Sequence, residues 1–327
     1  MTETLLTTPL HPLHRRLGAR LVAFAGYAMP VQYPSGILAE HAQCRTSAAL
    51  FDVSHMGQAV LEGAGAAAAL ERLTPADVQG LRPGRQRYAL LTSEEGGILD
   101  DVMVANLGGD RLFLVVNAAC KEADFARIGA ALPAGVRLAV RSDRALLALQ
   151  GPAAEAALVR AGAVEAASLP FMGAGEMTAA GVPCLVSRSG YTGEDGFEIS
   201  VAAEDAERLA LALLDDRGVA PAGLGARDSL RLEAGLCLYG NDIDRTTSPV
   251  EAGLAWTIGK RRRLDWDFPG AERIRRDLDD GPSRLRVGLL PEGRAPVRAH
   301  ATIHAADGTP VGEVTSGGFG PTLNAPA

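Results

Sequence analysis

"RQRYALLTSEEGGILDDVMVANLGGDRLFLVVNAA" occupies residues 85–119 and holds three strand-like runs in close succession. The runs cover 85–92, 97–107 and 111–119, and each is rich in Leu, Val or Ala. Two glycine-bearing turns, "SEEGG" and "GGD", separate them. The stretch therefore predicts three consecutive strands joined by turns.

The segments on either side complete a compact unit. An Ala- and Leu-rich run upstream favours a helix, and a run downstream places Phe125, Ile128 and Leu132 on one helical face. The order strand, helix, three strands, helix, strand predicts an α+β unit near residues 53–141. Its elements are expected at 58–63, 64–73, 85–92, 97–107, 111–119, 121–132 and 136–140.

The rest of the chain has a different pattern. We expect a buried strand at 145–152, an amphipathic helix at 203–216 and another helix at 226–235. Residues 257–285 are polar and arginine-rich, which indicates a connecting segment. The remaining residues, from "RLRVGLLP" onward, are typical of short strands with tight turns.

The composition is that of an acidic folded protein. The 327 residues are 47% hydrophobic and carry a net charge of −7, whereas a general nucleic-acid binder would usually be basic. Charges and prolines interrupt every apolar run, and the N-terminus lacks the apolar core of a signal peptide. We therefore expect no nucleic-acid or membrane partner and a cytoplasmic location.

Neither the cysteines nor the histidines have the spacing of metal ligands. The four cysteines are far apart in the sequence, and the six histidines form no pair of metal-binding type. Free thiols in a reducing compartment and no bound metal are the expectation. The cysteines are Cys44, Cys120, Cys184 and Cys237.

Asp100 and Asp101 interrupt an apolar strand in "GGILDDVMV". Side chains alternate between the two faces of a strand, so only one of these carboxylates can enter a given pocket. The other is expected to face water or a partner, because an unpaired buried carboxylate is costly. The pattern alone also fits two residues at a sheet edge or turn.

The segment "SRSGYTGEDGFEIS" (187–200) has glycines at every third position. It lacks the spacing of a dinucleotide-binding loop, and Glu194 and Asp195 would repel phosphate. One interpretation is a tight hairpin that needs glycines for positive φ. The other is a polar wall in which Tyr191 stacks on a ring and Glu194 or Glu198 accepts hydrogen bonds from ring N–H groups.

Two basic features are candidates for binding. Arg227 falls in the first turn of its expected helix, where a cation opposes the helix dipole, so an anionic ligand or a carboxylate partner is indicated. A structural salt bridge explains the residue equally well. The run "IGKRRRLDWDF" (258–268) is typical of a solvated face, and in an acidic chain Lys260–Arg263 are also suited to an acidic partner.

Several long motifs together resemble the glycine-cleavage T protein family, and the resemblance runs from Thr8 to the end of the chain. The motifs are "TPLHPLH" (8–14), "VAFAGYAMPVQY" (22–33), "LFDVSHMG" (50–57), "GGILDDVMV" (96–104), "LALQGP" (147–152), "LPFM" (169–172), "SGYTGEDGFEIS" (189–200), "ARDSLRLEAGLCLYGNDID" (226–244), "TSPVEAGLAWTIGKRRR" (247–263), "DFPGA" (267–271) and "TSGG" (315–318).

The resemblance implies an α+β fold with three domains in a cloverleaf around a tetrahydrofolate site. A ferredoxin-like domain would be inserted into a discontinuous folate-binding domain, and a β-barrel would follow. Family members continue for several strands beyond "TSGGFGPTLNAPA", so the barrel is expected to be incomplete. The expected boundaries are 1–52 plus 142–256, 53–141, the connecting segment 257–284, and the partial barrel 285–327.

The implied reaction takes the aminomethyl group from the lipoyl arm of H protein. Tetrahydrofolate is the one-carbon acceptor, and the products are 5,10-methylenetetrahydrofolate, ammonia and dihydrolipoyl H protein. The family's catalytic aspartate matches Asp101, and its substrate-binding positions match Glu198 and Arg227. Further candidates for the pocket wall are Met56, Tyr88, Asn117, Tyr191 and Tyr239.

Two alternatives remain on the sequence alone. One is a folate-dependent demethylase of a small methylated amine or thioether, because such enzymes share parts of these motifs. The other is a non-enzymatic folate-binding scaffold. Relatives of that class carry a cysteine in the loop that here reads "SGYTGEDG", and its absence favours the enzyme.

Overall fold

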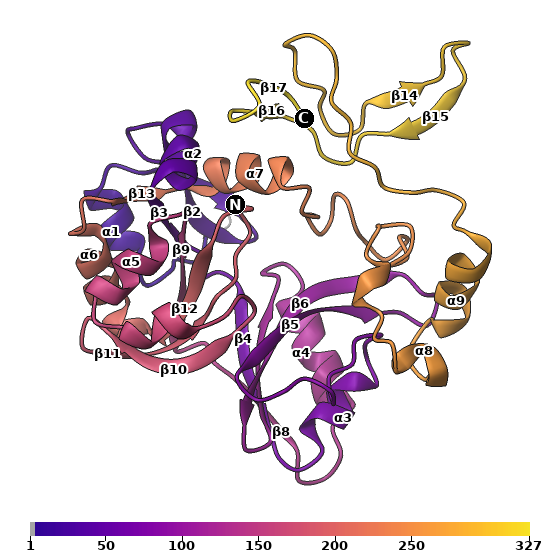
Figure 1. Ribbon diagram of the computed structural model, residues 1–327, viewed down its shortest axis with the longest axis horizontal. Helices are drawn as coiled ribbons and strands as arrows, with labels where there is room; N and C mark the ends of the chain where they lie inside the picture. The colour runs from indigo at the N-terminus through magenta and orange to yellow at the C-terminus, as the bar shows by residue number, and fades with distance from the viewer. Residues whose placement is uncertain (1–3) are drawn as a thin grey trace.

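The computed structural model describes residues 4–327 as an α+β protein built around two antiparallel-rich sheets (Figure 1). The sheets lie side by side, with helices on their outer faces. A helical connecting segment leads from them to a C-terminal region of short strands. The α+β class predicted from the sequence is confirmed.

The smaller sheet is formed by the stretch that begins at β4 and ends at β8. Its strand order is β5-β6-β7-β4-β8, with every neighbouring pair antiparallel. The succession of one strand, one helix, three strands, one helix and one strand is as predicted. The elements are β4 Gly57–Glu62, α3 Ala66–Glu71, β5 Arg85–Thr92, β6 Ile98–Gly108, β7 Arg111–Val116, α4 Lys121–Ala130 and β8 Arg137–Val140.

The larger sheet has six strands in the order β10-β11-β12-β9-β3-β13. Only β13 runs parallel to its neighbour, β3. One strand precedes the smaller sheet in the sequence and five follow it, so the larger sheet is discontinuous. The strands are β3 Ala48–Asp52, β9 Arg144–Gln150, β10 Ala174–Ala179, β11 Val182–Ser187, β12 Gly196–Ala202 and β13 Val219–Ala222.

Five helices and a hairpin surround the larger sheet. The predicted helix at 203–216 is confirmed with shorter bounds, and the one at 226–235 is confirmed two positions earlier, ending just before Gly235, which has a φ of 68°. The elements are α1 His11–Arg16, β1 Arg20–Phe24, β2 Tyr27–Gln32, α2 Ile37–Thr46, α5 Ala154–Arg160, α6 Ala206–Leu214 and α7 Leu224–Glu233.

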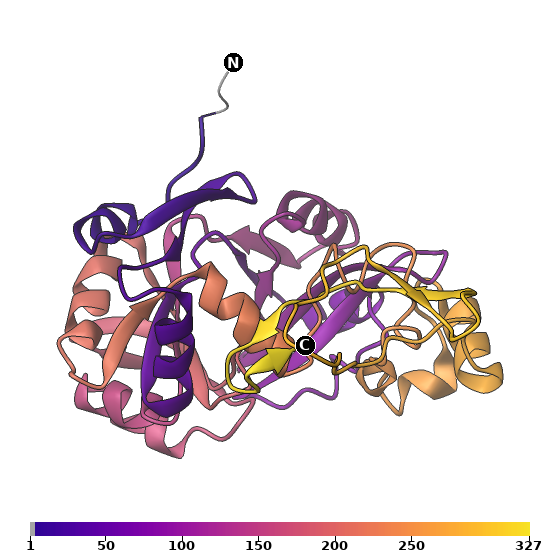
Figure 2. The ribbon, with the colours of Figure 1, turned by 90° about the horizontal axis from the view of Figure 1, so that it is seen from above.

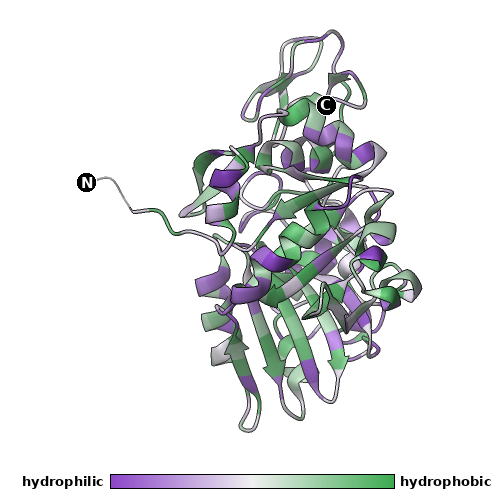
Figure 3. Ribbon diagram, turned by 90° about the vertical axis from the view of Figure 1, so that its left-hand side faces the viewer, coloured by the Kyte–Doolittle hydropathy of each residue, from purple (hydrophilic) through white to green (hydrophobic). Residues whose placement is uncertain are grey.

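The two sheets pack against each other through apolar side chains. Phe51 and Ala148 of the larger sheet belong to the same buried cluster as Phe113 and Val115 of the smaller one. Figure 3 shows the strands as largely hydrophobic, with the hydrophilic residues concentrated on the helices and at the strand ends. Residues on the facing surfaces of the two sheets can therefore meet, and this is where the candidate site lies.

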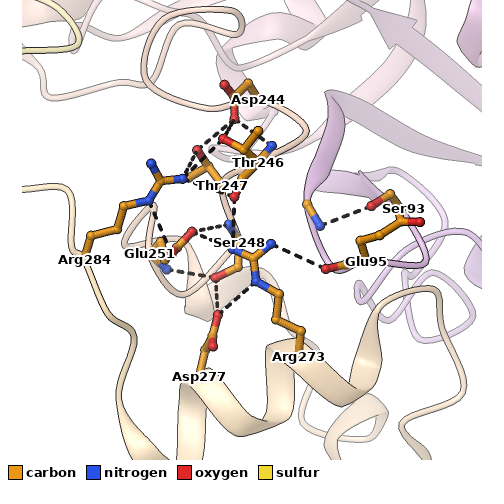
Figure 4. A network of polar contacts seen from close by, with 11 residues as sticks. Ser93, Glu95, Asp244, Thr246, Thr247, Ser248, Glu251, Arg273, Asp277 and Arg284 are labelled. Carbon is orange, nitrogen blue, oxygen red and sulfur yellow. Dashed lines mark hydrogen bonds and ion pairs between the residues drawn. The ribbon is translucent and has the colours of Figure 1, made fainter.

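A polar network holds the connecting segment against the smaller sheet (Figure 4). Arg273 of α9 (Ala271–Asp280) donates to the carbonyl of Thr246 at 3.0 Å and to Glu251 Oε2 at 2.9 Å. Ser248 Oγ donates to Asp277 Oδ2 at 2.7 Å. The short helix α8 (Arg262–Asp265) precedes α9. This network fixes the loop that begins at Asp244 against α9, and Arg273 also donates to the carbonyl of Glu95, which precedes β6.

The start of β6 is close to that loop. A Cβ built on Gly97 would lie 1.7 Å from the carbonyl oxygen of Arg245, so only glycine fits there. The next residue, Ile98, donates its N–H to the carbonyls of Asp244 and Thr247. The loop is therefore held two residues away from Asp100.

The C-terminal region is open (Figure 2). Its strands pair as two short hairpins, and over residues 285–327 they do not close into a barrel. The predicted strand at "RLRVGLLP" is wrong: the segment joins no sheet, although the N–H of Arg286 donates to the carbonyl of Glu251 at 2.7 Å, and Leu285 and Leu290 stay exposed. The strands are β14 Thr302–His304, β15 Pro310–Glu313, β16 Phe319–Gly320 and β17 Ala325–Pro326, and β16 packs on α7.

Candidate active site

The strand β6 carries both acidic residues of the "GGILDDVMV" motif. It lies between β5 and β7, so the interpretation of Asp100 and Asp101 as edge or turn residues is wrong. Asp100 is fully buried, whereas Asp101 is only partly buried, as the alternation of a strand predicts. Asp100 therefore faces partners inside the protein and not water.

One amide connects the two carboxylates. Asn117, which follows β7, donates from Nδ2 to Asp100 Oδ1 at 2.8 Å and to Asp101 Oδ1 at 2.7 Å. Its backbone N–H also donates to Asp100 Oδ2 at 3.0 Å. Asn117 thus fixes the position of Asp101 relative to a second, fully buried negative charge.

The environment of Asp101 is suited to proton transfer near neutral pH. Burial raises the pKa of Asp101 to about 7, and the charge of Asp100 adds to this rise. Hydrogen bonds with Tyr88 and Asn117 favour the carboxylate and oppose the rise. A carboxyl group with such a pKa can both accept and return a proton at pH 7.

A second group of candidates gathers on the larger sheet and α7. Glu198 lies on β12, and Arg227 reaches toward it from the first turn of α7. Burial lowers the pKa of Arg227, and the charge of Glu198 opposes that change. The guanidinium carbon of Arg227 lies 4.9 Å from the ring centre of Tyr191. Among the residues that the structure describes, Arg227 Nη1 is buried and has no hydrogen-bond partner.

Tyr191 lies between these two groups. Its hydroxyl donates to the carbonyl of Cys237, and Asp101 is close enough to raise the pKa of its phenol, after the larger effect of burial. One continuous site between the sheets therefore contains, in spatial succession, Glu198, Arg227, Tyr191 and Asp101. The mixed polar and charged lining is typical of a binding site.

The glycine-rich loop is anchored by close packing. A Cβ on Gly190 would lie 1.8 Å from Gln150 Oε1, so any larger residue would have to displace the Gln150 side chain. Only Gly193 of the three loop glycines has a positive φ, of 80°. The prediction that the glycines serve positive φ is therefore wrong for Gly190 and Gly196, both of which press against Gln150.

The acidic residues of that loop are already paired. Arg45 Nη1 contacts Glu194 Oε1 at 3.0 Å, and Arg188 forms an ion pair with Asp195. Within residues 4–327 Glu198 forms no ion pair, although Ser189 Oγ lies 3.5 Å from its Oε2. Between the two glutamates proposed as acceptors, Glu198 is thus the one free to bind a ligand.

Two openings adjoin the site. A small cavity between the sheets is bordered by Glu198, Gln86 and Ser187. A groove of about 400 Å³ runs on the other side, past Tyr88 and Trp256. The rings of these two residues stack at 5.6 Å, and Trp256 is 66% exposed. Tyr88 therefore has the groove on one side and Asp101 on the other.

The remaining candidates lie at the margins. Met56 packs against the apolar cluster between the sheets, of which Asp101 is not a member. Tyr239 donates to the carbonyl of Ile98 at 3.4 Å and lies near Asp100. Trp256 was missed by the sequence analysis, and its only signal was an aromatic residue inside the "AWTIGKRRR" motif.

The basic run at Lys260–Arg263 is mostly committed to internal contacts. Arg261 pairs with Asp77 at 2.8 Å, and Arg262 is only 2% exposed and pairs with Asp267. Arg263 donates to the carbonyl of Ala255 at 2.8 Å. The interpretation as a solvated face is therefore wrong for Arg262, which is buried, whereas the Arg261 side chain is 40% exposed while it pairs with Asp77.

Three observations concern metals, thiols and membranes. In residues 4–327 no group of three or more His, Cys, Asp or Glu side chains is arranged to hold a metal ion. All four cysteines are free thiols. No helix in the described part of the chain is long and apolar enough to cross a bilayer.

Comparisons with known proteins cover nearly the whole chain. Residues 10–262 match the GCVT N-terminal domain, and residues 284–326 match the glycine cleavage T-protein C-terminal barrel domain. Mitochondrial aminomethyltransferases from Gallus gallus and Homo sapiens are 49% and 47% identical, each over 98% of this chain and 83% and 81% of their own length.

A solved structure gives the same result. The glycine cleavage system aminomethyltransferase T from Bartonella henselae superposes with a TM-score of 0.93 at 45% identity. The match covers 99% of this chain and 88% of the Bartonella chain. Fold and sequence thus agree along the same residues.

Proposed function

The chain belongs to the glycine cleavage T-protein family, and we propose that Asp101 is the catalytic residue of its aminomethyltransferase reaction. The donor is the aminomethyl group on the lipoyl arm of H protein, and the acceptor is tetrahydrofolate. The observation that carries the proposal is a partly buried carboxyl with a pKa of about 7, held by Asn117 between a folate-type pocket and an aromatic groove.

Asp101 would act on the attacking nitrogen of the folate. As that nitrogen bonds to the transferred carbon it becomes positively charged, and a nearby carboxylate can hydrogen-bond it and accept its proton. The same negative charge stabilises the cation that develops as ammonia leaves. Tyr88 and Asn117 keep the carboxylate in one orientation, which saves the cost of arranging it during the reaction.

Glu198 and Arg227 would bind the folate. A carboxylate accepts two hydrogen bonds at once from an amidine-like N–H edge, as the pterin ring presents. The unpartnered Nη1 of Arg227 offers a donor to the same ligand, and Tyr191 offers an aromatic face. Met56 and Tyr239 would contribute only to the wall of the site.

The donor arm would enter from the opposite side. The groove past Tyr88 and Trp256 has the volume of a ligand site, and its aromatic floor suits an aliphatic thiol arm. Arg87 and Lys260 line it as cations, next to Asp77, which Arg261 already neutralises. Donor and acceptor would thus meet at Asp101 from two sides.

The test is turnover with authentic substrates. Aminomethyl-loaded H protein and tetrahydrofolate are supplied, and methylenetetrahydrofolate and ammonia are followed together. Both products in equal amounts are expected. Folate binding without either product would contradict the proposal and favour a scaffold, and product from a small methylated amine would favour a demethylase.

The domain boundaries and the compartment belong to the same proposal. We place the folate-binding domain at 1–52 plus 142–256, the inserted domain at 53–141 and the barrel at 285–327. Four free thiols are consistent with a reducing compartment such as the cytoplasm. The relatives from Gallus gallus and Homo sapiens are named as mitochondrial, and fractionation of cells would decide between the two compartments.

A further inference from the structure

The side of β6 away from the folate pocket holds a third carboxyl. Asp124 lies in the first turn of α4, is 3% exposed and is in hydrogen-bonding contact with Asp100. Among the described residues, its Oδ2 is buried and has no hydrogen-bond partner. Neither the motifs nor the proposed function assigns it a role.

The surroundings of Asp124 disfavour a negative charge. Asp100 and Asp101 face it from β6, and Cys120 and Arg127 accompany it on its own helix. Tyr239 and Arg245 approach Asp100 from the neighbouring loop, and Tyr88 approaches Asp101 from β5.

Lys121 and Arg127 are the two cations of α4. Both donate elsewhere, Lys121 to the hydroxyl of Tyr27 and Arg127 to the carbonyl of Thr92. The positive end of α4 favours an ionised Asp124 only weakly. Charging a buried carboxyl beside a second carboxylate costs more than this gain, so the neutral form of Asp124 is favoured. Burial and the contact with Asp100 accordingly raise the pKa of Asp124 to about 9.

A neutral Asp124 has one proton to donate, and Asp100 is its acceptor. Asp100 in turn accepts from the N–H and the Nδ2 of Asn117, and Asn117 donates to Asp101. The four residues form a chain of donors and acceptors in which each link fixes the next. With Asp124 neutral, Asp100 carries the one negative charge next to Asp101, instead of two charges on Asp100 and Asp124.

We propose that Asp124 is a positioning residue for the transfer reaction: as a neutral acid it donates to Asp100, which holds the Asn117 amide that orients Asp101. This inference rests on the proposed role of Asp101. It assigns a function to the face of β6 opposite Asp101. Loss of the Asp124 proton would add a second negative charge beside Asp100 and break the first hydrogen bond of the series that ends at Asp101.

Three variants separate the possibilities. Asp124→Asn keeps a donor toward Asp100 and is neutral at every pH. Asp124→Ala removes the donor. Glu122→Ala is the matched control, because Glu122 is an exposed acid in the same first turn of α4.

The first readout is the pH dependence of unfolding in urea. An acid whose pKa is raised on folding stabilises the folded state at low pH. That contribution is lost as the pH rises toward the pKa of the acid in the folded protein. The folded-to-unfolded ratio of the wild type should therefore fall relative to Asp124→Asn by about tenfold per pH unit above pH 5. If the free energies of unfolding of the two proteins changed in parallel with pH, Asp124 would be ionised and the proposal would be overturned.

The second readout is steady-state kinetics with H protein and tetrahydrofolate at pH 7. Asp124→Ala should lower kcat at least tenfold and change the KM for folate less than about threefold, and Asp124→Asn should restore kcat to within about threefold of the wild type. A wild-type kcat in folded Asp124→Ala would reduce Asp124 to a structural residue. An inactive wild type would instead contradict the proposed function, while the stability curves still report the proton.

Discussion

Asp100 and Asp101 are adjacent in the sequence and in one strand, yet they occupy different environments. Asp101 is partly exposed, lies near Tyr88 and Tyr191, and faces the space between the sheets. Asp100 has no exposed surface and contacts Asn117 and Asp124. The difference shows how one residue type yields a proton-transfer group on one face and a fixed charge on the other.

The largest effect is expected from Asp101→Asn. The amide keeps the size of the side chain but can neither accept a proton nor stabilise positive charge. We expect kcat to fall by about 10²–10⁴ while the Kd for tetrahydrofolate changes less than about threefold. Stopped-flow product formation and equilibrium binding measure the two quantities, and normal turnover with intact binding would remove Asp101 from the mechanism.

The acceptor side is tested by Glu198→Ala. Loss of a charge-assisted hydrogen-bond acceptor should raise the Kd for folate about 10–100-fold. Glu194→Ala is the control, because Glu194 is paired with Arg45 and should change the Kd little. Equal effects of the two substitutions would show that the loop, and not the strand, binds the pterin.

Asp100→Asn tests whether the buried charge tunes its neighbour. Removing a negative charge favours the carboxylate form of Asp101, so the pKa of Asp101 should fall. The acid limb of the profile of kcat/KM against pH should therefore move down by about one unit. If the acid limb does not move, the charge of Asp100 does not affect the pKa of Asp101.

The smallest effect is expected in the groove. Trp256→Ala should raise the KM for loaded H protein about 3–10-fold through lost contact area, with no change in folate affinity. Leu264→Ala is the control, because Leu264 is 81% exposed and does not line the groove. If both variants keep the wild-type KM, the donor arm enters elsewhere.

The order of elements around β6 was predictable because local patterns determine it. Three runs separated by glycine turns gave β5, β6 and β7, and a helical face with Ile128 gave α4. The failed strand at 285–290 has an apolar pattern of the same kind, but a strand also needs a neighbour to pair with its backbone.

The site was predictable only in part. An acidic pair inside an apolar strand pointed to Asp101, but its link to Asn117 depends on the register of β6 with β7. Asp124 lies four residues before Ile128 and so shares its buried helical face, a signal present in the sequence. Trp256 joins Tyr88 across 168 positions of chain, and no local pattern encodes such a contact.

The pH dependence of kcat/KM in the wild type and in Asp101→Asn tests the central claim most directly. For the wild type the account predicts an acid limb near pH 7 that follows one ionisation, with activity rising as Asp101 loses its proton. The residual activity of Asp101→Asn should lack that limb. The same limb in both proteins would assign the ionisation to another group and contradict a catalytic role for Asp101.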